Sequence, residues 1–462
     1  MNASAAAGRY LRPAPGPDGV LYVDMDDPTG SANKTNDLFK HELDLLLSRV
    51  EAGGKPKGLI FFSAKRSFGV GGDIGQVMTF ARGGETASIE DSERIKALFR
   101  RIERIGCPTV AIIEGTAAGG GWELALACHG RIVLDDPAIR LGFPEVDFGL
   151  VPGAGGMVRL VHLLGAAKAA RLVTGAAMQS PQAAHAEGLV TSLGSDRDDL
   201  LRLARSWIDE NPAPAQPWDK PGHGVSDRTL PGEPTGGAPA SDAPRLALAA
   251  IAEIASLPFE QGAMVESRCF ARCAVSAQAR ALIGLGFYDR NALRRRAAPI
   301  PGLSRSGSFA KALRLALQNE IAMLEGEGAE RKVIEASLTA AGYARSAVAA
   351  RAIHGKSNCP DETQIRRLIF SQVAAALRML DGTPFCAAAA NVASVEAGDF
   401  PRRTGGVLRF VEGLGPPGFL SAADELLARH GQRFVTPFAN SDDLSRCLAA
   451  ARQRDTEEGT HP

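Results

Sequence analysis

Two glutamates stand in settings suited to proton transfer. Glu123 follows the glycine triplet of residues 119–121, which itself follows an apolar run over residues 109–113. The run predicts a buried strand, and the glycines predict a turn that opens an Ala/Leu-rich helix. N–H groups at such a turn are free to bind an anion, which the helix dipole also favours. A carboxylate three residues further on indicates proton transfer beside a stabilised oxyanion.

The second glutamate, Glu145, follows a proline and precedes the glycine-rich residues 149–156. Each glutamate alone has a plainer interpretation. Glu123 could be an exposed first-turn residue that serves only the helix dipole, and Glu145 could be a surface turn residue. Together they favour an acid–base pair, and close packing in a dry site would leave one carboxyl neutral and the other ionised.

A second glycine loop, residues 69–74, follows the strand predicted at residues 58–63. Glycine lets a ligand atom approach the main chain closely. Alone, the loop is better explained as a flexible turn, but with the triplet at 119–121 it supplies the two separate donors that an oxyanion hole requires. Beside it, Lys65 and Arg66 could meet an anionic ligand tail or be solvated loop charges.

The remaining motifs argue against other chemistries. Residues 413–418 have the Gly-x-Gly-x-x-Gly spacing of a dinucleotide site, but Pro416 and Pro417 remove N–H donors and no βαβ context surrounds them. Cys269 and Cys273 have helical spacing but no further ligands nearby, so no metal site is predicted. The chain also lacks P-loop, HExxH and GxSxG motifs.

Composition narrows the class of protein. The 462 residues include 52 basic and 52 acidic side chains, so no net charge recruits nucleic acid or an anionic membrane. Seven cysteines without CxxC pairs indicate a reducing compartment. We find no signal-peptide core and no stretch of membrane-spanning length, so a cytoplasmic protein is expected.

The hydrophobic pattern divides the chain. Strands alternate with helices up to about residue 200, a Pro/Gly-rich stretch follows over residues 211–244, and the remainder is helical. This predicts an α/β fold followed by an all-α region. Strands are expected over residues 19–24, 58–63 and 109–113, and helices over residues 37–50, 92–105, 246–256, 260–287, 309–325, 331–341, 362–380 and 419–430.

Several motifs together resemble the enoyl-CoA hydratase/isomerase (crotonase) superfamily. They are residues 63–65 with 71–74, 118–128, 141–145, 149–156 and 183–190. The resemblance implies a crotonase-type fold of ββα repeats and an acyl-CoA thioester substrate. Its carbonyl would lie between the N–H groups of Gly72 and Gly120, Glu123 would activate water and Glu145 would protonate C2. Further substrate contacts are implied for Ala64, Lys65, Gly71 and Ile74.

The 22-residue interval between the glutamates is similar to that of alpha subunits of multifunctional fatty-acid β-oxidation enzymes. Later segments resemble the same alpha subunits. The linker and the helix that completes the hydratase domain are similar to residues 216–219, 257–260 and 281–287, and the end of the 3-hydroxyacyl-CoA dehydrogenase portion is similar to residues 400–414. That family carries a Rossmann domain, but here residues 294–303 run almost directly into the helical region. The usual motif after the first helix pair is also replaced by residues 341–345. The resemblance therefore implies that the dehydrogenase activity is absent and that NAD is not expected.

These observations define six expected segments. They are a hydratase core (1–205), a linker (206–245), helices completing the hydratase domain (246–298), two helical dehydrogenase-like remnants (299–356 and 357–450) and a disordered tail (451–462).

The expected function is an enoyl-CoA hydratase of fatty-acid β-oxidation that needs no metal or redox cofactor, with double-bond isomerisation as a side activity. The alternative is a non-catalytic acyl-CoA-binding subunit that docks a thiolase. A fold-related hydrolase is disfavoured because no nucleophile stands at the glycine loops. Homo-oligomerisation, a thiolase partner and the acyl chain length stay open.

Overall fold

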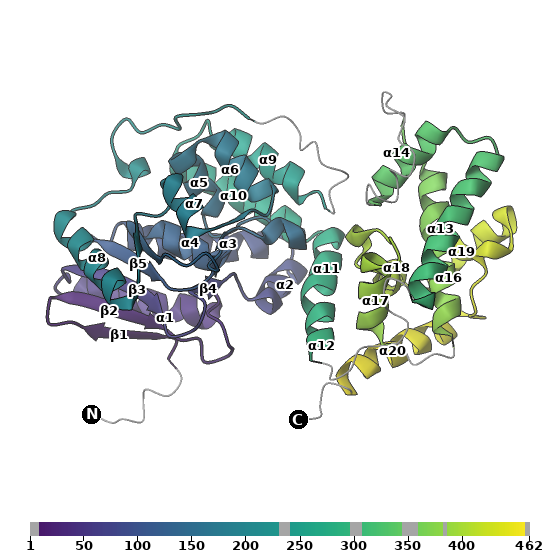
Figure 1. Cartoon of the computed structure of the whole chain (residues 1–462), viewed down its shortest axis with the longest axis horizontal. Coiled ribbons are helices and arrows are strands. Elements are labelled where there is room, and N and C mark those ends of the chain that lie inside the picture. Colours follow the sequence, from purple (N-terminus) through teal and green to yellow (C-terminus); the bar gives the residue numbers. More distant parts are fainter. Residues whose placement is uncertain (1–8, 231–240, 296–306, 344–358, 382–385, 458–462) are drawn as a thin grey trace. The chain divides into compact units, whose positions relative to one another are not determined.

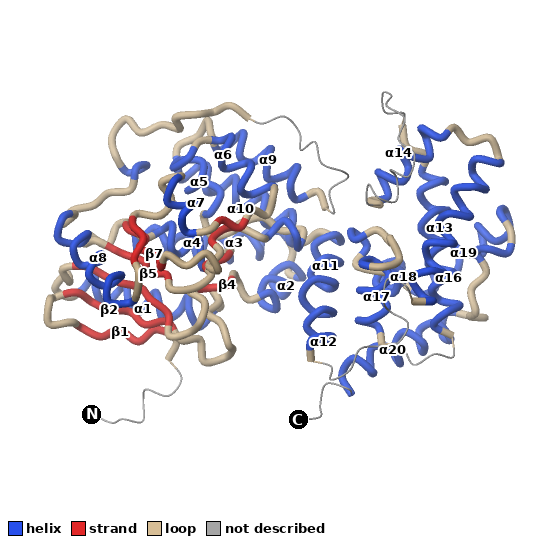
Figure 2. Tube along the Cα trace, viewed as in Figure 1, coloured by secondary structure: helices blue, strands red, loops and turns tan. Residues whose placement is uncertain are grey.

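The computed structural model describes residues 9–230, 241–295, 307–343, 359–381 and 386–457 (Figure 1). The chain forms two compact units. One contains Met1–Pro234 and Asp242–Ser276, and the other contains Thr235–Ser241 and Ala277–Pro462. Among the described residues, all strands belong to the first unit, and the second unit is built from helices and loops (Figure 2). The predicted α/β region followed by a helical region is therefore confirmed.

The first unit is organised around a six-stranded sheet of order β1-β2-β3-β5-β7-β10, parallel except for the edge pair β1–β2. Its strands are β1 (Leu11–Pro15), β2 (Val20–Met25), β3 (Gly58–Ser63), β5 (Thr109–Ile113), β7 (Gly130–Leu134) and β10 (Ser192–Gly194). Strand β5 is buried along its whole length, as a central parallel strand covered on both faces must be. Helix α8 (Arg197–Glu210) covers one face by packing Leu200, Ala204 and Ile208 on the strand side chains.

A second sheet of very short parallel strands lies in the same unit. Its order is β4-β6-β8-β9, with β4 at Gly69–Val70, β6 at Ala117–Ala118, β8 at Leu141–Gly142 and β9 at Met178–Gln179. The first three strands are parallel, and β9 pairs antiparallel with β8. Two-residue strands carry no period-2 pattern, so this sheet was not predicted.

Helices complete the first unit. They are α1 (Asp37–Ala52), α2 (Ile74–Arg82), α3 (Glu85–Glu103), α4 (Gly120–Ala127), α5 (Gly156–Leu164), α6 (Ala166–Thr174), α7 (Pro181–Ala186), α9 (Ala243–Ile254) and α10 (Phe259–Ala274). Helix α10 packs along α3 and contacts α5, which brings a late segment of the chain against the elements around Glu123.

The second unit has a large hydrophobic core and a smaller cluster at Cys386, Ala388 and Ala389. Its helices are α11 (Ala277–Ile283), α12 (Arg290–Arg294), α13 (Ser308–Gly326), α14 (Arg331–Ala341), α16 (Glu362–Leu380), α17 (Ala387–Glu396), α18 (Val407–Leu414), α19 (Pro416–His430) and α20 (Ser441–Glu457). A single cluster of buried side chains extends from Phe309 to Ala451. The segments 299–356 and 357–450, expected as separate remnants, therefore share one core in their described parts.

Several predicted boundaries differ from the structure. The helix expected over residues 260–287 is broken after Ala274, and residues from Ala277 group with the second unit rather than with the hydratase domain. The linker predicted from residue 206 begins later, because α8 continues to Glu210.

The disordered tail predicted from residue 451 is helical as far as Glu457, because Leu444, Leu448 and Ala451 form a buried stripe at helical spacing.

The Gly413–Gly418 motif lies at the joint between α18 and α19, where Gly415 has φ +73°. A helix rather than a strand precedes it, which supports the rejection of a dinucleotide motif on sequence grounds. No helix in the described ranges is long and apolar enough to cross a membrane.

Candidate active site

The short sheet aligns three segments that carry the candidate chemistry. Strand β4 leads to Gly71 and Gly72, β6 leads to the Gly119–Gly121 turn, and β8 leads to Glu145. Gly69 pairs with Ala117, and Ala117 pairs with Leu141. Because neighbouring parallel strands end at one edge of a sheet, all three segments emerge side by side.

Glycine is required where these segments touch. A Cβ on Gly69 would lie 2.9 Å from the Cα of Gly121, and one on Gly120 would lie 3.2 Å from the carbonyl carbon of Gly71. Gly71 and Gly119 also have φ of +91° and +51°, a region that L side chains rarely adopt. The two loops predicted from glycine content are therefore packed directly on one another.

The peptide groups of these loops are held by specific hydrogen bonds. The N–H of Thr35 donates to the Gly71 carbonyl at 3.0 Å, and the N–H of Gly119 donates to the Gly142 carbonyl at 3.0 Å. In the described ranges, the N–H groups of Gly72 and Gly120 donate to no protein atom. The site thus presents two oriented, unused backbone donors from adjacent strands.

Glu123 lies in the first turn of α4 and is 3% exposed. Its Oε1 accepts hydrogen bonds from the N–H groups of Ala154 at 2.7 Å and Gly156 at 2.9 Å, just before and at the start of α5. Burial raises the pKa of Glu123 to about 7, helped by the charge of Glu266 and opposed by the two N–H donors. Near neutral pH this carboxyl group can therefore change its charge.

Glu145 begins the short 3-10 helix Glu145–Phe148. The residue is partly exposed, but its Oε2 is buried and has no hydrogen-bond partner in the part of the chain that the structure describes. Burial, followed by the charge of Glu123, raises the pKa of Glu145 well above its usual value. The two carboxyl groups thus favour different states near pH 7, with Glu145 neutral and Glu123 able to ionise.

The Gly119→Ala variant is expected to lose both the loop geometry and the site. A Cβ at this position would overlap Glu145 Oε1 and lie 3.2 Å from the Cα of Gly71, in a backbone conformation that alanine tolerates poorly. We expect a loss of about 1–3 kcal/mol in unfolding free energy, measured by urea denaturation. Gly188→Ala is the control for positive φ alone, because φ there is +81° and no atom lies within 4 Å of the added carbon. Equal losses in the two variants would contradict the close packing.

Glu123→Gln should stabilise the protein in alkaline solution. The folded-state pKa of Glu123 is raised, so the folded protein holds this proton more tightly than the unfolded chain, and stability falls as pH rises from about 4.5 to about 7. Removing the titration should increase the unfolding free energy at pH 8 by about 1–3 kcal/mol, with little change at pH 4. Urea denaturation at both pH values measures this, and an equal effect at the two pH values would contradict it.

The other predicted site residues lie in different surroundings from one another. Gly71 packs on the glycine turn, and Ile74, two residues after Gly72, is the first residue of α2. Ala64 is exposed at the end of β3. Lys65 donates from Nζ to the carbonyl oxygens of Asp27, at 2.6 Å, and Gly30. Its ammonium group therefore holds the loop that contains Asp27 and Gly30. The sequence had suggested instead that Lys65 meets an anionic ligand tail or is solvated.

Sequence reasoning missed the residues that hold Glu123 in place. Glu266 of α10 is completely buried and accepts hydrogen bonds from the N–H groups of Gly155 at 2.6 Å and Val158 at 2.9 Å. Arg159 of α5, 1% exposed, pairs through Nε with Glu103 Oε1 at 2.7 Å. No local motif marks Glu266, since only the folded arrangement brings α10 to the start of α5.

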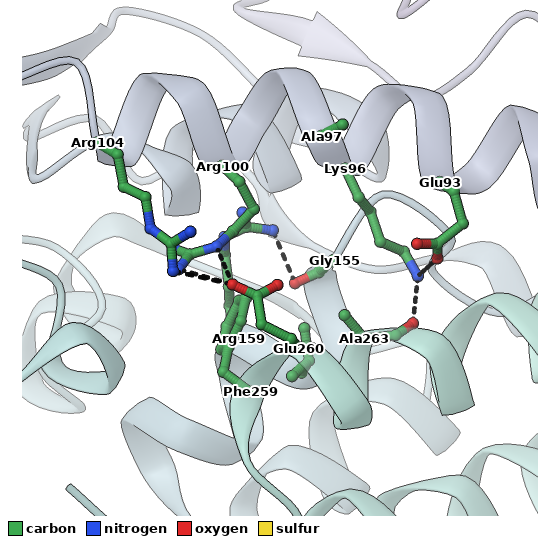
Figure 3. Close-up of a pocket in the computed structure, with 11 residues that line it drawn as sticks. Glu93, Lys96, Ala97, Arg100, Arg104, Gly155, Arg159, Phe259, Glu260 and Ala263 are labelled. Atoms are coloured by element: carbon green, nitrogen blue, oxygen red, sulfur yellow. Dashed lines mark hydrogen bonds and ion pairs between the residues drawn. The ribbon is translucent and has the colours of Figure 1, made fainter.

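Behind this segment lies a polar cavity of about 470 Å³ between α3 and α10 (Figure 3). Lys96, Arg100, Arg104 and Arg159 are among its lining residues. Arg100 and Arg104 both pair with Glu260 and Asp219. The described ranges contain no group of three or more His, Cys, Asp or Glu side chains arranged to hold a metal ion.

Residues 16–215 match the enoyl-CoA hydratase/isomerase family, so this part of the chain is a crotonase-superfamily domain, as the motifs indicated. More particularly, the chain is 39% identical over 178 residues to the fatty acid oxidation complex subunit alpha of Idiomarina loihiensis. It is 32% identical over 292 residues to the protein of that name in Acinetobacter baylyi. These matches cover 38% and 59% of this chain but 25% and 40% of the relatives, so it spans well under half of their length.

The chain is also similar to solved structures. An enoyl-CoA hydratase from Bacillus halodurans is 17% identical with a TM-score of 0.45, over 59% of this chain and 98% of that one. One from Thermoplasma volcanium is 24% identical with a TM-score of 0.40, over 44% and 78%. At these scores the likeness carries no argument beyond the family match.

Proposed function

We propose that this protein adds water across the 2,3 double bond of 2-enoyl-CoA thioesters. One observation carries the proposal: two glutamates that favour different protonation states stand beside two backbone N–H groups that donate to no protein atom in the described ranges. The family match supports a hydratase or isomerase, and the retention of both acids favours hydration. Fatty-acid β-oxidation is the proposed context, because the matched curated relatives are named as fatty acid oxidation complex subunits.

In the proposed reaction, the thioester carbonyl oxygen accepts hydrogen bonds from the N–H groups of Gly72 and Gly120. These donors stabilise the negative charge that develops on this oxygen, and each can contribute about 3–4 kcal/mol to the transition state. Ionised Glu123 takes a proton from water as the water oxygen bonds to C3. Neutral Glu145 gives its proton to C2. The proton must then pass from Glu123 to Glu145 before the next turnover.

Glu123 is suited to the role of base. Its Oε1 is occupied by the N–H groups of Ala154 and Gly156, which leaves Oε2 without a protein partner in the described ranges and available to a water molecule. Glu145 is suited to the role of acid because its buried, unpartnered carboxyl group keeps its proton. We propose that the protein has no dehydrogenase activity and does not use NAD. The likeness of the helical region to dehydrogenase C-terminal domains stays a prediction.

A second candidate function is that of a non-catalytic acyl-CoA-binding subunit, and the names of the relatives, which are subunits of a complex, favour it. In that case a thiolase would be the proposed partner. Isomerisation of the double bond is a third outcome, since the same two acids could move a proton between carbons.

The deciding experiment follows the absorbance of crotonyl-CoA and of a longer 2-enoyl-CoA after addition of the protein, first alone and then with NAD. Loss of the enoyl absorbance without NADH formation is the expected result. NADH formation would contradict the proposed loss of dehydrogenase activity. No hydration of either substrate, together with co-purification of a thiolase, would favour the non-catalytic subunit.

A further inference from the structure

The start of α5 is shared by two carboxylates from different helices. The main chain at residues 154–158 directs the N–H groups of Ala154 and Gly156 to Glu123 of α4. It directs those of Gly155 and Val158 to Glu266 of α10. The donors therefore alternate along the first turn, and neither carboxylate can move without disturbing the peptide groups that hold the other.

The geometry points to Glu266 as a positioning residue for Glu123: by fixing the N–H groups of Gly155 and Val158, it orients those of Ala154 and Gly156 toward Glu123 Oε1. This inference rests on the proposed function and assigns Glu266 no contact with substrate. Glu266 uses both carboxylate oxygens, one on each N–H group, which is the arrangement that an ionised side chain prefers.

Glu266 is itself held from behind by α3. Lys96 Nζ lies 3.9 Å from Glu266 Oε1 and donates to the Ala263 carbonyl and to Ser267 Oγ on α10. Figure 3 shows Lys96 reaching from α3 to α10, with Gly155 between the two helices. Lys96 is 4% exposed, so this positive charge is buried beside the carboxylate that it neutralises.

Few charged side chains among the described residues act on Glu123 and Glu266. Glu123 is influenced by Glu266 on α10 and Arg159 on α5, and its own charge acts on Glu145. Burial raises the pKa of Glu266, and Lys96 on α3, the two N–H donors and Arg159 oppose this rise. Lys96 also pairs with Glu93 on α3, and the charge of Glu266 also raises the pKa of Glu145. Removing the negative charge of Glu266 should therefore lower the pKa of Glu123, because a neighbouring anion opposes its ionisation.

The test compares Glu266→Gln and Glu266→Asp with the wild type in hydration of crotonyl-CoA from pH 5 to pH 9. Glutamine has one accepting oxygen and no charge, so it cannot place a separate oxygen on each N–H group as Glu266 does. Glu266→Gln should therefore lower kcat about 10- to 100-fold with KM little changed. It should also move the acid limb of the kcat profile to lower pH. Glu266→Asp keeps the charge but draws it back from the helix, so kcat should fall without that movement of the acid limb.

Glu260→Gln is the matched control, because Glu260 lies on the same helix with its side chain 57% exposed and, among the described residues, bonds only to arginines. It should leave both kcat and the acid limb unchanged. If Glu266→Gln and Glu266→Asp keep wild-type kcat, or if Glu266→Gln loses stability while the acid limb stays in place, Glu266 is merely structural and the inference is overturned.

An inactive wild type would refute the proposed function but not this inference, which has a second readout. The unfolding midpoints of Glu123→Gln, Glu266→Gln and the double variant at pH 8 form a double-mutant cycle. Shifts that do not add would show that the two carboxylates act on one another through the start of α5. Additive shifts would overturn the inference even for a protein that never turns over substrate.

Discussion

Glu145→Gln is expected to abolish measurable hydration of crotonyl-CoA, lowering kcat on the order of 10³-fold, and Glu123→Gln should lower it by a similar factor. General acid and base groups each contribute factors of this size when they transfer a proton in the transition state. Glutamine has nearly the same shape but can neither release a proton to C2 nor take one from water. Because the variants retain the loops that bind the thioester, KM should change much less than kcat.

The control for Glu145→Gln is Asp147→Asn, two residues further along the same short helix. Asp147 is exposed and should not contribute to catalysis. The pH profile gives an independent check. Activity should fall below about pH 7 as Glu123 becomes protonated, and at high pH as Glu145 loses its proton. If both glutamine variants hydrated the substrate at wild-type rates, the acid–base mechanism would be wrong.

Arg159→Met should cause the largest loss of stability, about 3–5 kcal/mol in unfolding free energy. The Glu103 side chain is fully buried and that of Arg159 is 1% exposed. Removing the arginine takes away the partner of Glu103 Oε1 at 2.7 Å and leaves this buried carboxylate with Arg100 on its other oxygen. Arg159 also donates from Nη1 to the Ala154 and Gly155 carbonyls, so the variant removes two main-chain hydrogen bonds next to Glu123 as well.

Two further variants test this account by urea denaturation. Arg171→Met breaks an exposed pair with Glu187 and should change the unfolding free energy by less than about 1 kcal/mol. The double variant Glu103→Met/Arg159→Met should recover part of the loss, because it also removes the buried carboxylate, which Arg159→Met alone leaves with Arg100 and one cation fewer. A double variant less stable than Arg159→Met alone would show that packing, rather than charge, accounts for the loss.

The parts of the fold that were predicted correctly are those with strong local patterns. Strand β5 is a run of apolar residues, and α16 has the stop and start signals and spacing of an amphipathic helix. Strands β4, β6 and β8 consist of two residues each, and nothing in such short Gly- and Ala-rich pieces distinguishes a strand from a turn. They form because neighbouring loops bring their backbones into register, which is a tertiary effect.

The residues of the candidate site also divide into those with a local sequence pattern, which were predicted, and those without one, which were missed. Glu123 and Glu145 were singled out because glycines and a proline surround them in the sequence, and the family resemblance gave them roles. Glu266 and Arg159 were missed because each looks like an ordinary charged residue on an amphipathic helix. Their importance depends on burial and on contacts between helices far apart in the chain, neither of which local sequence encodes.

The pairing of β4 with β6 also sets how the chain tolerates insertions. An extra residue around Ala64 and Arg66 would disturb the contacts that Lys65 makes with Asp27 and Gly30, but Gly69 could stay opposite Ala117. An extra residue between Gly69 and Gly72 cannot be accommodated so easily, because it would shift the following backbone by about 3.3 Å along the strand direction. A different peptide group would then face the glycine turn. Length variation should therefore be tolerated better before Gly69 than after it, although the two stretches are only a few residues apart.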